Sequence, residues 1–383
     1  MTEGTECMNI SIIVPMYHGE KYVNSILEQV KRNAENAPDV RLELLLYNDC
    51  PEETVTVNET IYNFDVRIIN AKKNAGIHGA RVSALRQAAG EYILFLDQDD
   101  VIKDHYIVSQ YSRIGSADAV VCRLINGKRL HYTNSFRFEE VITRDFMLNH
   151  WCPIVSPGQV LLKKEAVPDI WKENILKNNG ADDYFLWLCM MAAEKCFVLN
   201  QEVLFKHVIT GFSVSEDTNL MMDSEEEMIG ILERERVFLG YDPQRFDDLK
   251  RSLRRIHVKQ LDRQRKGLLC LDQINRSIRK RGAMYDWIES RKGKKIAVYG
   301  AGELGLALRE LLEEQGLAVS CYLDRNAEYI LSEPAAYTME DANAELDSIL
   351  LTVSDQELER KLKQKFACEV MNMETISYTC GKI

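Results

Sequence analysis

The 383-residue sequence lacks several features that would place it in a specialised class of protein. Its ten cysteines include no Cys-x-x-Cys pair and no zinc-finger spacing with histidine. This favours free thiols in a reducing compartment over disulfides or structural zinc. The N-terminus, Met-Thr-Glu-Gly-Thr-Glu, lacks the basic and apolar segments of a signal peptide. The longest apolar run, residues 184–193, is about half the length of a bilayer span. The sequence therefore predicts a cytoplasmic protein.

Internal repeats and low-complexity tracts are also absent, but charge is unevenly distributed over the net value of −11. Residues 250–295 contain 16 Lys and Arg against 4 Asp and Glu, which leaves 32 basic and 55 acidic residues elsewhere. Because the basic excess is confined to one helical segment, nucleic-acid binding is not expected. Two interpretations remain open for this segment. It is either a solvated helical connector or a peripheral contact with anionic lipid head groups at the inner membrane face.

Apolar strand-like runs alternate with helical periodicity over the first hundred residues. The pattern predicts strands at residues 9–15, 41–47, 66–70 and 91–96, and helices at residues 21–32 and 79–89. Such alternation predicts a mainly parallel sheet with helices on both faces. Ligands of such sheets bind beyond the carboxyl ends of the strands. Pro15, Asp49, Asn74 and Asp97 are expected at those ends, so one edge of the sheet collects the polar residues.

Three carboxylates follow the buried strand at residues 91–96 within four positions, namely Asp97, Asp99 and Asp100. Extended geometry would point Asp97 and Asp99 to the same side, about 6.5–7 Å apart. Two such carboxylates repel each other unless a cation lies between them, and hard oxygen ligands suit Mn²⁺ or Mg²⁺. The alternative is an ordinary charged turn that closes a strand.

Five short blocks resemble, in the same order, blocks of the family 2 glycosyltransferases. They read Ile-Ile-Val-Pro-Met-Tyr at 12–17, Asn-Asp at 48–49, Asn-Ala-Gly-Ile-His-Gly-Ala-Arg at 74–81, Ala-Gly-Glu-Tyr-Ile-Leu-Phe-Leu-Asp-Gln-Asp-Asp at 89–100, and Gly-Ala-Asp-Asp-Tyr-Phe-Leu-Trp at 180–187. The resemblance covers about residues 9–215. It implies a GT-A fold, a nucleotide-sugar donor, a divalent cation and transfer with inversion.

The resemblance also implies roles for individual residues. The donor-binding residues would be Pro15, Tyr17, Asp49, Asn74, Gly76, Arg81, Asp97 and Gln98. The metal-binding residues would be Asp97, Asp99 and His207, with Ser213 or Ser215 nearby, and the general base would be Asp183, supported by Asp182. Plain structural roles are the alternatives: a turn for Asp49, a surface position for Arg81, a structural hydrogen bond for His207, and helix capping for Asp182 and Asp183.

Two positions depart from the family's pattern and bear on the donor. The family usually has Asp-Gly-Ser where this chain has Asp49-Cys50-Pro51, and Ala-Arg-Asn where it has Ala80-Arg81-Val82. Donor identity is therefore open, with a UDP-sugar expected.

A second α/β pattern begins near residue 294, after helical stretches predicted at residues 225–240 and 244–290. Gly300, Gly302 and Gly305 form a Gly-x-Gly-x-x-Gly turn between a strand and a helix, and Asp324 ends the next strand. This is a dinucleotide fingerprint and a possible nucleotide site. About 90 residues make half of a dinucleotide fold, however, so NAD binding is not expected. The segment resembles small Rossmann-like modules attached to sugar-nucleotide and surface-polysaccharide enzymes.

The sequence thus predicts an α/β protein of three parts: a GT-A glycosyltransferase domain at residues 1–215, a helical connector at 216–292 and a Rossmann-like domain at 293–383. The expected function is a metal-dependent inverting glycosyltransferase in polysaccharide biosynthesis, acting on a glycan or lipid-linked glycan. Two alternatives stay open. One is a catalytically inactive scaffold that binds a nucleotide sugar, and the other is a sugar-nucleotide oxidoreductase that acts through the C-terminal domain. A homodimer is also left open.

Overall fold

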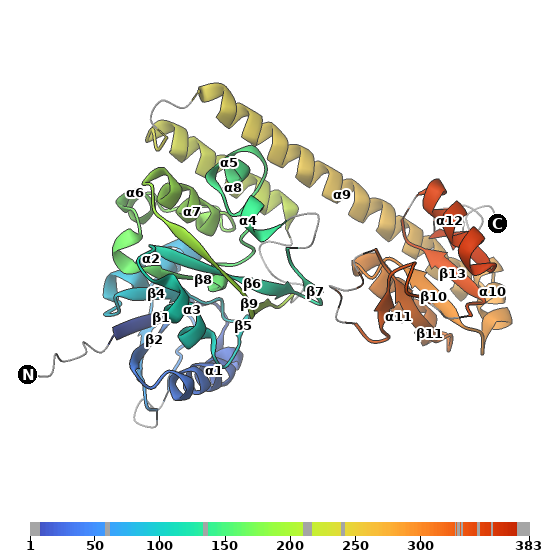
Figure 1. Ribbon diagram of the computed structural model, residues 1–383, viewed down its shortest axis with the longest axis horizontal. Coiled ribbons are helices and arrows are strands. Elements are labelled where there is room, and N and C mark those ends of the chain that lie inside the picture. Colours follow the sequence, from blue (N-terminus) through green and yellow to red (C-terminus); the bar gives the residue numbers. More distant parts are fainter. Residues whose placement is uncertain are drawn as a thin grey trace, which may run out of the picture. The chain divides into compact units, whose positions relative to one another are not determined.

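The computed structural model describes residues 8–57, 62–132, 137–209, 217–238, 242–325, 327, 330, 332–342, 345–353 and 355–373. The chain divides into two compact units (Figure 1). The first comprises Met1–Gly127 and His131–His257, and the second comprises Lys128–Leu130 and Val258–Ile383. The division falls inside the segment 216–292, for which the sequence predicted a separate connector. The limits of the three predicted parts stay a prediction.

Eight described strands of one sheet form the centre of the first unit. They are β1 (Met8–Met16), β2 (Val40–Asn48), β3 (Asp65–Asn70), β4 (Tyr92–Phe95), β5 (Val101–Ile102), β6 (Ala119–Asn126), β8 (Val160–Lys163) and β9 (Phe197–His207), whereas β7 (Arg129–Leu130) falls in the second unit. Their order is β3-β2-β1-β4-β8-β6-β9-β5. The first four strands are parallel, and β8 runs antiparallel between β4 and β6. The predicted mainly parallel α/β sheet is confirmed.

Helices cover both faces of this sheet (Figure 1). They are α1 (Val23–Asn36), α2 (Gly76–Gln87), α3 (Tyr106–Ile114), α4 (Phe138–Val141), α5 (Arg144–Asn149), α6 (Asp169–Glu173), α7 (Asp182–Ala192) and α8 (Thr218–Arg234). The crossovers from β1 to β2 and from β3 to β4 run in opposite directions along the sheet, so right-handed connections place α1 and α2 on opposite faces. Helix α3 joins α1 through a hydrogen bond from Ile107 N to Asn33 Oδ1 (3.0 Å). Helices α6 and α7 join α2 through the His78 ring, which contacts Trp171 and Phe185.

The carboxyl ends of the four parallel strands meet at one edge of the sheet. The register pairs Met16 with Asn48, Asn48 with Asn70, and Ile13 with Phe95. Strand β4 lies in the interior because its side chains, Tyr92–Phe95, are apolar on both faces and fully buried. The loops that leave these four ends therefore bring distant segments of the chain together.

Two predicted boundaries near this edge are wrong. Strand β4 ends at Phe95, and a hydrogen bond from Asp100 N to Asp97 O (3.1 Å) closes a turn. Asp97 and Asp99 are thus residues of a turn, and the extended spacing predicted for them does not apply. Helix α2 begins at Gly76 rather than at residue 79. Gly76 has φ 72°, a backbone conformation that glycine adopts without strain, so the chain enters the helix three residues earlier than periodicity indicated.

The helical stretches after residue 216 also differ from the prediction. Asp217 caps α8 by accepting from Asn219 N (2.9 Å) and Leu220 N (3.1 Å), so this helix begins at Thr218 instead of residue 225. The single helix predicted at residues 244–290 is two helices, α9 (Pro243–Arg279) and α10 (Ala283–Arg291). Arg281 breaks it with φ 53°, whereas Gly267 lies within α9. The predicted end at residue 240 falls outside the described residues.

The second unit contains a five-stranded parallel sheet. Its elements are β10 (Ile296–Tyr299), α11 (Glu303–Glu314), β11 (Val319–Leu323), β12 (Ala336–Tyr337), β13 (Ser348–Leu351), α12 (Gln356–Phe366) and β14 (Glu369–Asn372), and the strand order is β12-β11-β10-β13-β14. Alternate residues of β10 enter two separate cores: Val298 packs with Ile274 and Ile278 of α9, and Ala297 packs with Leu362 of α12. One core lies on each face of the sheet, as the period of two in a strand requires.

Candidate active site

The loops after β2 and β3 meet at the polar edge of the first unit. The buried Asp49 carboxylate accepts from Ala75 N at 2.9 and 3.0 Å, and Asn74 Oδ1 accepts from Gly76 N at 2.9 Å. Burial raises the pKa of Asp49, while the backbone N–H groups of Ala75 and Gly76 lower it. A Cβ atom on Gly76 would lie 2.8 Å from Asn179 Oδ1, so glycine is also required sterically. The structure thus brings together three predicted donor-binding residues in one hydrogen-bonded corner.

The loops after β1 and β4 form a second contact at this edge. Gln98 makes two hydrogen bonds with the Tyr17 backbone: its Oε1 accepts from Tyr17 N, and its Nε2 donates to Tyr17 O, both at 3.1 Å. Pro15 is the penultimate residue of β1, where it pairs in register with Tyr47. The Tyr17 ring is half exposed, which leaves an aromatic face available beside the loop that carries Asp97.

Arg81 links two carboxylates that are far apart in the sequence. Its guanidinium is buried and donates to Asp182 Oδ2 (2.6 Å) and to Asp97 Oδ1. The alternative of a surface arginine is therefore wrong for Arg81. These two ion pairs hold the first turn of α7 against the loop after β4. The donor-binding role of Arg81 stays a prediction.

Asp100, which the sequence left without a role, is the most enclosed carboxylate of the Asp97–Asp100 turn. It accepts from Ser156 Oγ (3.0 Å) and Val208 N (2.9 Å), and its Oδ1 lies 2.9 Å from His207 Nδ1. Burial alone would lower the pKa of His207, but the hydrogen bond and the charge of Asp100 raise it. Asp100 and Ser156 thereby orient His207 beside the other carboxylates. No sequence spacing connects Ser156 or Asp100 with His207, so only their three-dimensional proximity reveals this role.

Asp99 lies in the same turn and has no ion pair among the residues that the structure describes. Its pKa rises to about 6, because of burial and then because of the neighbouring charges of Asp100 and Asp97. Such crowding of carboxylates disfavours their ionised forms unless a cation is bound. The oxygen atoms of Asp97 and Asp99, with the second ring nitrogen of His207, therefore fit a hard divalent cation such as Mg²⁺ or Mn²⁺. Ser213 and Ser215 lie outside the described residues.

The two aspartates of α7 have different environments. The N-cap of α7 is Ala181, and no side chain caps the helix, so the predicted capping alternative is wrong for both residues. Asp182 is buried against Arg81, and its carbonyl accepts from Trp171 Nε1 (2.7 Å). Among the described residues, the hydrogen-bond partner of the Asp183 carboxylate is Tyr184 N (2.6 Å). Burial and the adjacent Asp182 raise the pKa of Asp183 to about 8, against the lowering effect of Arg81. The pKa of Asp183 therefore lies near the pH range in which a general base operates, and the residue can accept a proton where it is ionised.

The glycine fingerprint of the second unit is explained by packing within that unit. A Cβ atom on Gly305 would lie 1.8 Å from Gly300 O, and one on Gly300 would lie 2.4 Å from Thr352 Oγ1. Asp324, the predicted ribose ligand, accepts from Ala301 N at 3.0 Å and from Arg129 at 3.1 Å. The residues of this turn thus satisfy one another without a nucleotide.

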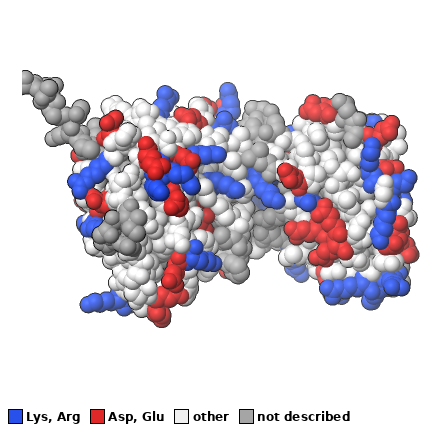
Figure 2. All heavy atoms as spheres, turned by 90° about the horizontal axis from the view of Figure 1, so that it is seen from below, with Lys and Arg blue, Asp and Glu red and all other residues white. Residues whose placement is uncertain are grey.

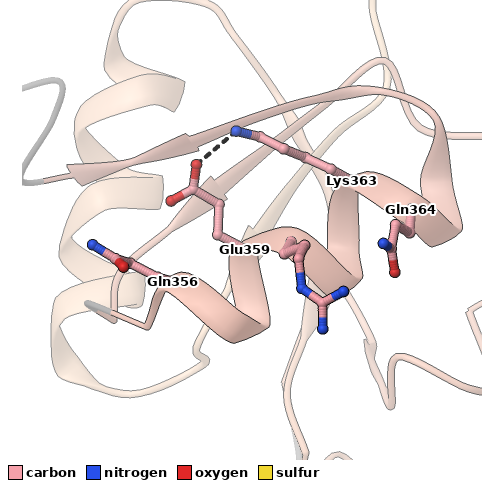
Figure 3. A pocket seen from close by; sticks show the side chains of 5 residues that line it. Gln356, Glu359, Lys363 and Gln364 are labelled. Carbon is pink, nitrogen blue, oxygen red and sulfur yellow. Dashed lines mark hydrogen bonds and ion pairs between the residues drawn. The ribbon is translucent and has the colours of Figure 1, made fainter.

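A shallow depression also lies on α12 of the second unit (Figure 3). Its lining side chains all come from this one helix, and Glu359 within it forms an ion pair with Lys363 at 2.7 Å. An i,i+4 pair on an exposed helix is a common surface feature. This depression lacks the converging polar groups of the edge formed by Asp49, Asp97 and Asp183.

Part of the first unit is similar in sequence to a known protein family. Residues 11–171 match the family described as Glycosyl transferase family 2. The match includes the loops that carry Tyr17, Asp49, Arg81 and Asp97, and it covers less than half of the chain. The matched segment is thus similar to family 2 glycosyltransferases.

Several curated proteins are similar to parts of the chain. It is 34% identical over 98 residues to the poly(ribitol-phosphate) beta-N-acetylglucosaminyltransferase TarS of Staphylococcus aureus (strain Mu50), over 25% of this chain and 17% of TarS. It is 30% identical over 106 residues to the minor teichoic acid biosynthesis protein GgaB of Bacillus subtilis (strain 168), over 27% of this chain and 12% of GgaB. An uncharacterised glycosyltransferase of Haemophilus influenzae is 26% identical over 163 residues, covering 41% of this chain and 53% of that protein. The matches span about half the length of these relatives or less.

Two solved structures align with this chain at low sequence identity and low TM-score. The crystal structure of S. aureus TarS 1-349 aligns with a TM-score of 0.43 and 16% identity, covering 64% of this chain and 70% of that one. The mannosyltransferase PcManGT from Pyrobaculum calidifontis, solved in complex with GDP-Man and Mn²⁺, aligns with a TM-score of 0.42 and 16% identity, covering 64% of this chain and 68% of that one.

Proposed function

We propose that this protein is a metal-dependent, inverting glycosyltransferase that moves a sugar from a nucleoside-diphosphate donor to a hydroxyl group of a surface glycan. The observation that carries the proposal is the arrangement of carboxylates at one edge of the sheet. Asp97, Asp99 and Asp183 converge there from the turn after β4 and from α7, within or next to the region that matches family 2 glycosyltransferases. Arg81 bridges these two elements.

The donor would lie along the loops at the carboxyl ends of β1 to β4. The half-exposed ring of Tyr17 and the corner formed by Asp49, Asn74 and Gly76 are suited to a nucleoside. Asp97, Asp99 and His207 would hold the divalent cation, which when bound neutralises charge on the diphosphate leaving group. Arg81 and Gln98 position the turn that presents these ligands, through the contacts to Asp182 and Tyr17.

Asp183 would accept the proton of the attacking hydroxyl. Inversion requires one such base on the side of the acceptor, and a raised pKa suits that task at neutral pH. Asp182 cannot serve equally well, because its carboxylate is occupied by the buried guanidinium of Arg81. Asp182 is thus a positioning residue that fixes the start of α7 and with it Asp183.

The names of the relatives guide the choice of substrates. TarS is named for transfer of N-acetylglucosamine to poly(ribitol phosphate), and GgaB for teichoic acid biosynthesis. A UDP-sugar donor and a surface polymer or lipid-linked acceptor follow as the first candidates for this protein. Among the described residues, no helix has the length and hydropathy needed to cross a membrane. As separate proposals, we place its action at the cytoplasmic side, with peripheral membrane contact and a homodimer as further candidates.

The decisive test is hydrolysis of common nucleotide sugars by the full chain with and without Mn²⁺. One donor should release its nucleoside diphosphate only with Mn²⁺, and Asp183→Asn should abolish the release. An exposed carboxylate away from the site provides the matched control, Asp104→Asn, which removes only its ion pair with Arg32. Donor binding without turnover in any assay would instead support the inactive scaffold. Reduction of NAD by a nucleotide sugar would support an oxidoreductase.

A further inference from the structure

His18, Cys50 and Glu53 form a compact cluster on the loops that follow β1 and β2. His18 Nδ1 lies 2.7 Å from Glu53 Oε1 and 3.6 Å from Cys50 Sγ. Potential ligand atoms of all three residues lie within 4.8 Å of one another. The cluster adjoins Tyr17 and Asp49 in the sequence but shares no residue with the carboxylate site around Asp97.

The Asn48 side chain holds the backbone of two of these residues, Cys50 and Glu53, in place. The buried Asn48 amide donates to Glu53 O (2.7 Å) and Cys50 O (3.3 Å), and its Oδ1 accepts from Cys50 N (3.2 Å). His18 adopts φ 48°, an uncommon conformation for a residue other than glycine. Such backbone conformations persist where the surrounding structure requires them, and they are concentrated at functional sites. The cluster is thus preorganised by its loops.

The ligand chemistry of the cluster is that of zinc. Zn²⁺ accepts thiolate, imidazole and carboxylate ligands, and a site with three protein ligands keeps the fourth position for water. With bond lengths of about 2.3 Å to sulfur and 2.0–2.1 Å to nitrogen, a tetrahedral ion separates those two ligand atoms by about 3.5 Å. The observed distance between Cys50 Sγ and His18 Nδ1 is 3.6 Å. Glu53 would need to move back slightly from its hydrogen bond, and its exposed side chain has room to do so.

We propose that His18 Nδ1, Cys50 Sγ and a carboxylate oxygen of Glu53 form a Zn²⁺-binding site with one position open to water. The soft thiolate distinguishes this site from the oxygen-rich site of Asp97 and Asp99, which suits Mn²⁺ or Mg²⁺. The family 2 glycosyltransferases usually have glycine at the position of Cys50, so the site is a feature of this chain. It is independent of the proposed glycosyltransferase function.

Binding must release a proton. The Cys50 sulfur carries a hydrogen, which it donates to Glu52 Oε2 at 3.4 Å. Formation of the sulfur–zinc bond displaces that proton to the buffer, and His18 contributes the lone pair of Nδ1. Zinc binding should therefore become tighter as pH rises, and its heat should depend on the ionisation enthalpy of the buffer.

Calorimetry of the full chain with ZnCl₂ tests the site, with millimolar MgCl₂ present and in the Asp99→Asn background to suppress binding at the carboxylate site. One Zn²⁺ should bind with release of a proton. Cys50→Ser should weaken binding by more than about 100-fold, the upper range for loss of an outer-shell partner. His18→Gln and Glu53→Gln each change a side chain that is at least partly exposed, so they keep the test valid if Cys50→Ser fails to fold.

The matched controls are Cys196→Ser, an exposed free thiol of the same unit, and His105→Gln, which removes a contact with Glu202. Both should bind Zn²⁺ as the Asp99→Asn parent does. Co²⁺ in place of zinc should give a thiolate charge-transfer band that Cys50→Ser lacks. Absence of Zn²⁺ binding in the parent, or equal affinity in the Cys50, His18 and Glu53 variants, would overturn the proposal and leave a hydrogen-bonded cluster.

Discussion

Among individual residues, the proposed active site contains more acidic than basic groups. Asp97, Asp99, Asp100 and Asp183 lie near one another, and the cationic groups among them are Arg81 and, when protonated, His207. Burial of several carboxylates together raises their pKa values, because each one loses hydration and faces its neighbours' charge. This excess of acidic over basic groups favours the binding of a cation at the site.

The first prediction concerns Asp99. Asp99→Asn should abolish Mn²⁺-dependent binding of a nucleoside diphosphate, because it removes the carboxylate that has no competing ion pair among the described residues. Isothermal calorimetry with UDP and Mn²⁺ measures the effect, and Asp104→Asn should bind like the wild type. Unchanged UDP affinity in Asp99→Asn would remove the metal role from this residue.

The second prediction separates chemistry from folding at the start of α7. Asp183→Asn should lower kcat by about 10²–10⁴, the usual contribution of a positioned base, with donor affinity nearly intact. Asp182→Asn should instead destabilise the protein by about 3–5 kcal/mol, because it leaves Arg81 buried with one partner fewer. Turnover assays and urea unfolding measure the two effects. If Asp182→Asn folds normally and loses more activity than Asp183→Asn, the base is Asp182.

The third prediction concerns pH. Because the pKa of Asp183 is raised to about 8, this carboxyl group is protonated below that value and cannot accept a proton. The kcat/KM value should therefore rise with pH, by up to tenfold for each unit below the apparent pKa. An ordinary aspartate titrates near 3.9 and would give a flat profile from about pH 5 to 8. A flat profile would show that the pKa of Asp183 is not raised in the working enzyme.

Among the elements, α9 combines a strongly basic composition with many ion pairs. At least eight of the 16 basic residues at 250–295 contact a carboxylate. Several partners lie outside that window, as with Lys250 and Glu233 (2.9 Å) or Arg254 and Glu226 (2.6 Å). Figure 2 shows both signs of charge on each unit on the face in view. The excess counted in the sequence is therefore partly neutralised in the fold.

The fourth prediction follows from the basic residues that remain. Arg255 and Lys259 are exposed and have no ion pair among the described residues. Vesicle sedimentation should show weak binding to anionic but not to neutral lipid, with about 1 kcal/mol per basic residue near the surface, screened as salt rises through about 0.15 M. The Arg255→Glu/Lys259→Glu variant should lose the binding to anionic lipid, and Lys361→Glu/Lys365→Glu on α12 should retain this binding. Equal binding to both lipids, or none, would leave α9 as a connector.

In the whole molecule, the second unit includes more of the chain than the glycine fingerprint indicated. Ile274, Ile278 and Ile288 are buried in its core, although they precede residue 293, the predicted start of the domain. A fragment that begins at residue 293 would lose these side chains, each of which contributes about 1.5–3 kcal/mol when buried. Ligand tests of this unit are therefore best made on the full chain.

The fifth prediction is that NAD and NADP leave the melting temperature of the full chain unchanged at millimolar concentration. Close packing accounts for Gly300 and Gly305, and Asp324 is already hydrogen-bonded to Ala301 N. A ligand at 100 times its Kd would stabilise the protein by about 2.7 kcal/mol, which a thermal shift detects easily. A shift with NAD that disappears in Asp324→Ala would contradict this prediction.

The alternation of elements in the first unit was predictable from the sequence. Buried strands and amphipathic helices carry their periods of two and 3.6 in consecutive residues, so the runs that became β1 to β4 could be recognised locally. The same holds for the edge at which Asp49 and Asp97 lie, because the carboxyl ends of parallel strands share one side of a sheet. Helix limits were less accurate, since capping by Asp217 and the break at Arg281 depend on single residues.

The partners of the site residues were decided only by the tertiary structure. Arg81 meets Asp182 101 positions away, and Asp100 meets His207 107 positions away. His18 likewise meets Glu53 across two loops. Periodicity describes which face of an element is buried, but it contains no information on which loops meet at the edge of a sheet. That depends on strand order and register, and these in turn decide which carboxylates lie close enough to share a proton, an arginine or a metal ion.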